Sequence, residues 1–169
     1  MMATPGSFHL NSYFQFEECL PAPVLYCSAK VNSLGCTPAL SSSGTPSATN
    51  AHGFTVSASS LLNQKLGLWF YSLDGRDRTP FAGGLRCVAP PVHRTPSGST
   101  GGNPLPNDCS GSSSIDMNSF GLGLLGGNPS PLLRQPGRTV RMQFVSRDPG
   151  FAPPDNLSLT GGLEYVIGL

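Results

Sequence analysis

The sequence predicts an all-β chain that folds as an antiparallel, jelly-roll-like β-sandwich. Its 21 glycines and 17 prolines supply 38 of 169 residues, and both residue types disfavour helix interiors. Several segments alternate apolar and polar residues with the period of two that half-buried strands show. No segment has a convincing period of 3.6 residues, so two packed sheets are the expected architecture.

The strand candidates come at irregular spacing along the chain. The first, residues 7–18, alternates in two short pieces, and residues 21–31 enter a strand from prolines. Residues 54–62 alternate on Phe54, Val56 and Ala58. The strongest apolar run is 66–73, which contains Trp69, the only tryptophan, and we expect that side chain in the core. The remaining strand candidates are residues 85–91, 112–125, 138–149 and 162–169.

Polar segments rich in Gly, Pro and Ser separate these candidates. Residues 40–53, 74–84 and 95–108 are predicted as connections on that basis. We expect residues 1–20 to form an N-terminal extension and residues 21–169 to form one sandwich domain, because the chain is too short for a second full domain.

Charge and hydropathy exclude two classes of partner. Only 11% of residues are charged and the formal net charge is +1, so the chain has no electrostatic footprint for nucleic acid. No apolar run approaches the ~20 residues that cross a bilayer. We therefore expect neither nucleic-acid binding nor membrane insertion.

Five cysteines in a small chain favour an oxidising compartment, where disulfides persist. The spacing of Cys27, Cys36, Cys87 and Cys109 fits neither a zinc site nor a redox motif. The simplest pairing joins Cys27 to Cys36 and Cys87 to Cys109, although four cysteines allow three connectivities. Cys19 is then left over, either buried or paired with another chain. The opening residues show no signal-peptide pattern, so the expected extracellular location depends on the cysteines.

Ordered blocks of sequence carry a family resemblance over residues 26–169. They include YCSAKVNSLGCTP, HRTP, GGN, NDCSG and VSRDPG. Together they resemble an uncharacterised family of secreted bacterial surface domains in which C-x-AK-x-NS-x-GC-x-P, RTP/GGN, DCSG and SRDP blocks recur in this order. The resemblance implies a β-sandwich outside the cell and brings no catalytic residues.

Sequence patterns typical of enzymes are weak. The G-x-S-x-G motif of serine hydrolases is missing. The acidic residues are better explained as turn residues than as the paired catalytic carboxylates of a glycoside hydrolase. The DGRD stretch, Asp74 to Asp77, suits a plain turn better than a calcium loop. We expect no enzyme, no cofactor and no metal site. Covalent glycans are expected at Asn156, in an N-x-S sequon, and at Thr45 and Thr95 in Ser/Thr-rich stretches.

The N-terminal segment is the most distinctive feature. It alternates like a strand and is unusually aromatic; its candidate assembly residues are Phe8, Leu10, Tyr13, Phe14 and Phe16. An apolar terminal segment must dock, either on its own sheet or on the edge of a neighbouring copy. The second option predicts a homopolymer: a structural subunit of an extracellular filament or surface layer. The alternative is a secreted carbohydrate-binding module.

Overall fold

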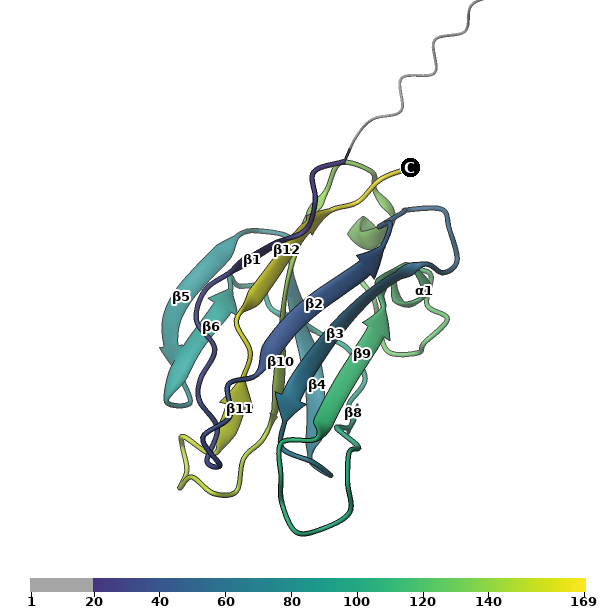
Figure 1. Cartoon of the computed structure of the whole chain (residues 1–169). Helices are drawn as coiled ribbons and strands as arrows, with labels where there is room; N and C mark the ends of the chain where they lie inside the picture. The colour runs from purple at the N-terminus through teal and green to yellow at the C-terminus, as the bar shows by residue number, and fades with distance from the viewer. Residues whose placement is uncertain (1–19) are drawn as a thin grey trace, which may run out of the picture.

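The computed structural model describes residues 20–169 and confirms an all-β sandwich of antiparallel sheets (Figure 1). The larger layer, sheet A, has the strand order β1-β12-β10-β4-β7, with β11 also paired to β10 and β8 to β4. Its strands are β1 (Val24–Tyr26), β4 (Leu66–Ser72), β7 (His93–Arg94), β8 (Gly98–Ser99), β10 (Thr139–Arg147), β11 (Leu157–Leu159) and β12 (Gly162–Val166).

The smaller layer, sheet B, has the order β2-β3-β9. Its strands are β2 (Ala39–Gly44), β3 (Phe54–Leu61) and β9 (Gly111–Asp116), and a separate hairpin is formed by β5 (Arg76–Phe81) and β6 (Gly84–Val88). Two short helices follow β9, α1 (Met117–Gly121) and the 3-10 helix η1 (Pro131–Arg134). The two layers are therefore unequal, and the hairpin adds a partial third layer.

The main core lies between sheets A and B, as the sequence pattern predicts. Trp69 is 3% exposed, and its ring centroid lies 5.0 Å from that of Phe144. A second apolar cluster lies on the opposite face of sheet A, where Phe70, Val145 and Leu159 pack beneath the hairpin. Because β4 is covered on both faces, its sequence is a continuous apolar run instead of an alternating one.

Three strands overlap segments that were predicted as connections. β2 (39–44) overlaps the predicted connection 40–53, β5 (76–81) lies within the predicted loop 74–84, and the two-residue β8 (98–99) lies within the predicted connection 95–108. The predictions for β2 and β5 were wrong for the same reason. ALSSSG and RDRTPF are edge or hairpin strands that bury few side chains, so they lack the apolar alternation by which strands are recognised.

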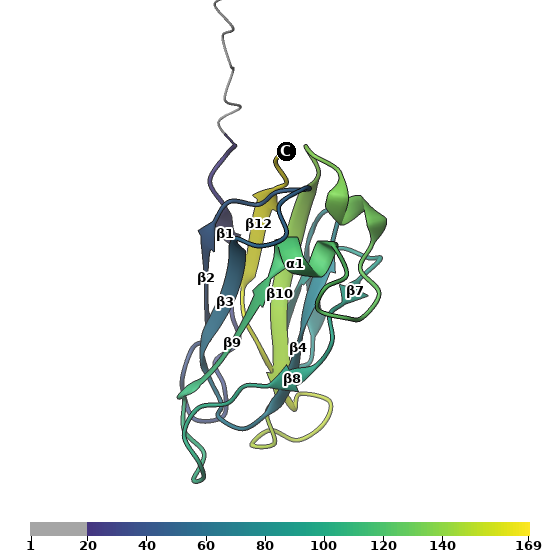
Figure 2. The ribbon, with the colours of Figure 1, turned by 90° about the vertical axis from the view of Figure 1, so that its right-hand side faces the viewer.

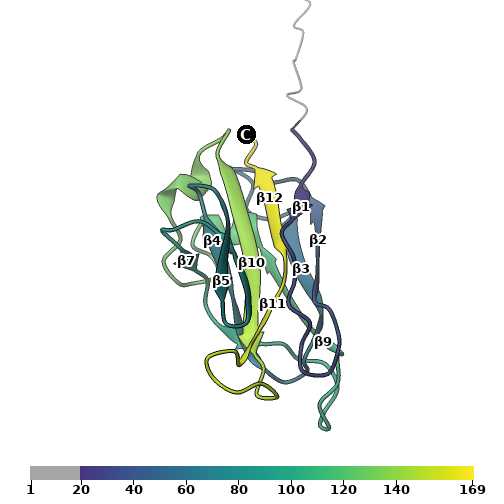
Figure 3. The ribbon, with the colours of Figure 1, turned by 90° about the vertical axis from the view of Figure 1, so that its left-hand side faces the viewer.

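The sandwich has two open sides. The strands β8 and β9 border one of them (Figure 2), and β1 and β2 border the other (Figure 3). Leu20, the first described residue, packs against Gly168, so the described chain begins and ends at the same end of the domain (Figure 1). β2 ends there as well, because the bridge Ser47–Gly168 follows it closely.

Candidate assembly surfaces

Polar residues of the NSLGC and SRDPG segments hold loops in place. Asn32 accepts hydrogen bonds from the backbone N–H groups of Leu34 (3.1 Å) and Cys36 (3.0 Å). The carboxylate of Asp148, which is fully buried, accepts hydrogen bonds from the N–H of Ser33 (2.9 Å) and its hydroxyl (2.5 Å). These contacts join the NSLGC and SRDPG blocks at one corner, and they satisfy main-chain groups instead of presenting reactive atoms.

Lys30, of the AK block, is held in the same way. Its ammonium group donates to the carbonyl oxygens of Ala82 (2.8 Å), Leu157 (2.9 Å) and Asp155, and it lies 4.3 Å from the centroid of the Phe151 ring. The side chain therefore ties the hairpin tip to the loop between β10 and β11. Its three donors are used within the fold, which leaves Lys30 no free donor for chemistry.

The disulfides join distant segments, and the predicted local pairing was wrong. Cys27 is bonded to Cys87 and Cys36 to Cys109, with sequence separations of 60 and 73 residues. The first bond ties the end of β1 to β6, and the second ties the β1–β2 loop to the segment before β9. Local pairing looked simplest because each predicted partner was near in sequence, but the folded strands place Cys27 beside the hairpin instead. Cys19 lies outside the described residues.

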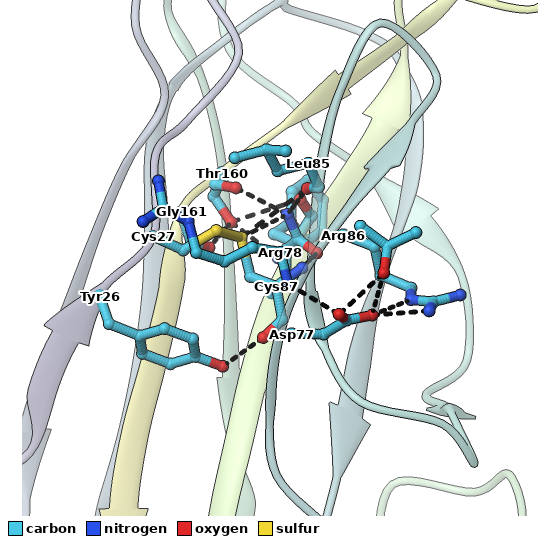
Figure 4. Close-up of a disulfide and its surroundings, with 12 residues drawn as sticks. Tyr26, Cys27, Asp77, Arg78, Leu85, Arg86, Cys87, Thr160 and Gly161 are labelled. Carbon is cyan, nitrogen blue, oxygen red and sulfur yellow. Dashed lines mark hydrogen bonds and ion pairs between the residues drawn. A yellow bond between two sulfur atoms is a disulfide. The ribbon is translucent and has the colours of Figure 1, made fainter.

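A buried glutamine next to the first disulfide was missed by the sequence analysis. The amide nitrogen of Gln143 donates to the carbonyl oxygens of Leu85 and Thr160, both at 2.8 Å, and its oxygen accepts from the N–H of Cys87 at 2.9 Å. These three partners lie together beside the Cys27–Cys87 disulfide (Figure 4). Gln143 is fully buried. In the alternating RTVRMQFVS segment, a polar residue between the apolar Met142 and Phe144 is expected to face solvent. The hairpin covers that face of β10 and buries Gln143 instead.

Charged side chains near the hairpin form ion pairs. Glu164 bonds Arg76 at 3.0 Å and Arg141 at 2.7 Å. The hydrogen bond from Arg76 lowers the pKa of Glu164, assisted by Arg141 and opposed by partial burial. Asp77, of the DGRD stretch, pairs with Arg86, whose hydrogen bond lowers the pKa of that carboxyl. Asp77 therefore lies in strand β5 and not in the predicted turn, and its carboxylate is engaged in the ion pair with Arg86.

One serine–histidine contact resembles part of a catalytic triad. His52 Nδ1 lies 2.7 Å from the hydroxyl of Ser119, but that hydroxyl donates to the carbonyl of Ala51 and Ser119 is only 2% exposed. Asp116 accepts from the backbone N–H groups of Ser119 and Gly53, as an N-terminal cap of α1. A buried hydroxyl whose proton is already donated is a poor nucleophile.

The predicted glycan acceptors fall in different environments. Thr45 is exposed and Asn156 is half-buried at the surface. Thr95 is 6% exposed, and its hydroxyl oxygen accepts from the backbone N–H of Trp69 at 3.1 Å. Thr95 is therefore removed as a glycosylation site, because a glycan there would displace a contact within the core.

The outer edge of β2 is an open strand edge. β2 pairs with β3 from Ala39 to Gly44 without a register shift, and the N–H of Thr45 continues the ladder to Gly53 at 2.9 Å. Odd-numbered residues of β2 therefore turn their backbone groups toward β3, and Leu40 and Ser42 turn theirs outward. Within residues 20–169, no hydrogen bond reaches the outward N–H and C=O groups of these two residues. The strand also lacks a proline, a charge or a bulge, the usual devices that protect edges.

A shallow groove lies beside this edge, between β1 and β2. It has a volume of about 190 Å³, and Leu25, Pro38 and Leu40 are among its lining residues. Val24 and Leu25 on β1 are 47% and 60% exposed. We call this edge and groove together the β2 edge site. It offers unpaired backbone groups and apolar surface, the two requirements for adding a strand.

The candidate donor residues Phe8, Leu10, Tyr13, Phe14 and Phe16 lie outside the described residues. The comparisons with family models, curated proteins and solved structures find no match to this chain. Over residues 20–169, no helix is both long and apolar enough to cross a membrane. In the same part of the chain, no group of three or more His, Cys, Asp or Glu side chains lies close enough together to hold a metal ion.

Proposed function

We propose that this protein is a structural subunit of an extracellular bacterial filament or surface layer, which assembles head to tail by β-strand addition. The open edge of β2 is the observation that supports this proposal most. An unprotected strand edge beside apolar surface accepts an extended segment through main-chain hydrogen bonds, while the groove selects its side chains. The two long-range disulfides fit an oxidising environment outside the cell.

The donor in this proposal is the N-terminal segment Ser7–Phe16 of a neighbouring copy. Its alternation places Phe8 and Leu10 on one face, which suits the apolar side chains of Leu25, Pro38 and Leu40 in the groove beside β2. Low overall charge keeps repulsion between copies small. Because the donor precedes Leu20 and the acceptor lies on the side of the sandwich, each copy carries two different surfaces, and such a contact need not close into a ring.

The first test removes a single outward-facing backbone N–H group from β2. In Ser42→Pro, the outward N–H of residue 42 is lost while the β2–β3 ladder is kept, because proline is tolerated where the N–H faces away from the sheet. Ser42→Ala keeps that N–H and serves as the matched control. We expect wild type and Ser42→Ala to form polymers in concentration-dependent size exclusion and electron microscopy, and Ser42→Pro to stay monomeric with an unchanged unfolding midpoint.

Deletion of residues 1–16 tests the donor separately. We expect the truncated protein to be monomeric and to be captured by added full-length polymer ends. A wild-type protein that stays monomeric at millimolar concentration would overturn the assembly proposal. Polymers of Ser42→Pro like those of wild type would instead place the acceptor elsewhere and overturn the β2 edge site.

The alternative function, glycan binding, depends on exposed aromatic side chains above a groove. Trp69 is 3% exposed and Tyr71 is fully buried, so neither offers a stacking platform to a sugar ring. We therefore place glycan binding second. Retention of the monomer on polysaccharide columns, lost on replacing an exposed aromatic, is the result that would reverse this order.

A further inference from the structure

The outer face of sheet A is only partly covered by the β5–β6 hairpin. Beside the hairpin, at the start of β4 and the end of β10, lies a groove of about 380 Å³, which we call the outer groove. Its apolar lining includes Leu66, Leu68, Val145 and Leu157. Leu66 is 57% exposed and Leu68 and Leu157 are partly buried, whereas Val145 is only 6% exposed, so the three leucines form the part of this apolar surface that faces solvent.

Two arginines give the outer groove a positive rim. Arg94 pairs in register with Phe70, and its guanidinium carbon lies 5.6 Å from the centroid of that ring. Arg147 is the last residue of β10, directly after Ser146, which pairs with Gly67 next to Leu66. In residues 20–169, neither guanidinium makes an ion pair or a hydrogen bond, and no acidic side chain lines the groove. The groove thus combines an apolar floor with uncompensated positive charge.

The backbone of the floor is already paired. β4 lies between β10 and β7/β8, and β10 lies between β4 and β11/β12, so their N–H and C=O groups are used within the sheet. Among the described lining residues, Ser97 supplies the only side-chain hydroxyl that can reach a ligand, because the hydroxyl of Ser146 is buried. A bound peptide or sugar would find partners only in Arg94, Arg147 and Ser97 and would bury its other polar groups unpaired, which is costly. An alkyl chain has no such groups.

We propose that the outer groove binds a single-chain anionic amphiphile, such as a fatty acid. The alkyl chain lies along Leu66, Leu68, Val145 and Leu157, and the carboxylate is held by Arg94 and Arg147. This site is separate from the β2 edge site, and it does not depend on the assembly proposed above. If the ligand binds there, the proposed structural subunit also carries a fatty acid on its surface.

Titration of ¹⁵N-labelled protein with decanoate, below its micelle concentration, tests the proposal. We expect saturable amide shifts confined to β4, β7, the end of β10 and β11. The methyl ester of decanoate, which lacks the charge, and acetate, which lacks the chain, are expected to bind at least fivefold more weakly. Arg94→Gln and Arg147→Gln should each weaken decanoate binding about two- to fivefold, as exposed ion pairs do, whereas Arg134→Gln on η1 should not.

Leu66→Glu provides a sharper variant. It places a carboxylate in the groove that Arg147 also lines, in the path of the alkyl chain, so we expect decanoate binding to fall more than tenfold. Leu34→Glu, at a similarly exposed leucine in the β1–β2 loop (48% exposed), is the matched control and should bind normally. Equal binding of decanoate and its ester, shifts spread over the whole domain, or binding to phosphatidylglycerol vesicles without binding to decanoate would overturn the proposal.

Discussion

The side-chain oxygen of Gln143 accepts a hydrogen bond from the backbone N–H of Cys87 at 2.9 Å, across 56 residues of sequence. The same amide donates to Leu85 in β6 and to Thr160 before β12. One side chain therefore joins the central strand β10, the hairpin and the last strand. Because the amide is fully buried, each of these partners depends on it for its hydrogen bond.

Gln143→Leu should lower the free energy of unfolding by about 3 kcal/mol or more, because it leaves one buried donor and two buried acceptors unpaired. Denaturant unfolding with the disulfides intact measures the change. Gln135→Leu, at an exposed position, is the control and should change stability by less than about 0.5 kcal/mol. If Gln143→Leu also lowered the free energy of unfolding by less than about 0.5 kcal/mol, water would have to replace the hydrogen bonds of the amide.

Non-reducing peptide mapping should recover Cys27 linked to Cys87 and Cys36 linked to Cys109. The two bonds close loops with sequence separations of 60 and 73 residues, so the chain-entropy model assigns each about 4 kcal/mol. We expect the double variants Cys27→Ala/Cys87→Ala and Cys36→Ala/Cys109→Ala to lose similar amounts. Recovery of a Cys27–Cys36 peptide would contradict this topology.

The sequence predicted those parts of the fold that follow from local pattern. Val140, Met142 and Phe144 alternate with period two because one face of β10 packs on sheet B, and they are buried as expected. The connectivity of the disulfides and the burial of Gln143 depend on which part of sheet A the β5–β6 hairpin packs against. No local sequence pattern encodes that long-range contact. β2 was missed for a related reason: its outward edge and serine-rich face bury little, and that same feature makes it the candidate acceptor.

Stability should fall on acidification because the pKa of Glu164 is lowered from its ordinary value of 4.5 by its hydrogen bond with Arg76, assisted by Arg141. Above pH 4.5 the carboxylate is ionised in both states and the stabilisation is complete. As the pH falls below 4.5, the unfolded chain takes up the proton first, so stability decreases until the lower folded pKa is passed. Arg76→Gln should flatten this slope in unfolding midpoints measured between pH 3 and 6, whereas Arg138→Gln should leave it unchanged.

Lys30→Met should loosen the hairpin tip and the loop between β10 and β11. The substitution removes hydrogen bonds to the carbonyl oxygens of Ala82, Asp155 and Leu157, and charged donors of this kind contribute about 1.5–3 kcal/mol in favourable cases. Hydrogen exchange should therefore accelerate for residues 81–85 and 151–157. Lys65→Met, which removes a single bond to Asn107, is the control and should leave exchange in both segments unchanged.

Ser146 and Ser158 face each other across β10 and β11, both are 1% exposed, and neither hydroxyl has a partner within residues 20–169. A buried hydroxyl without a partner costs free energy that alanine does not. We expect Ser146→Ala and Ser158→Ala each to raise the free energy of unfolding by about 1 kcal/mol, while Ser43→Ala at the exposed face of β2 changes it little. A loss of stability in both single variants, restored in the double variant, would mean that the two hydroxyls bond each other and that the pair contributes a cross-strand hydrogen bond to sheet A.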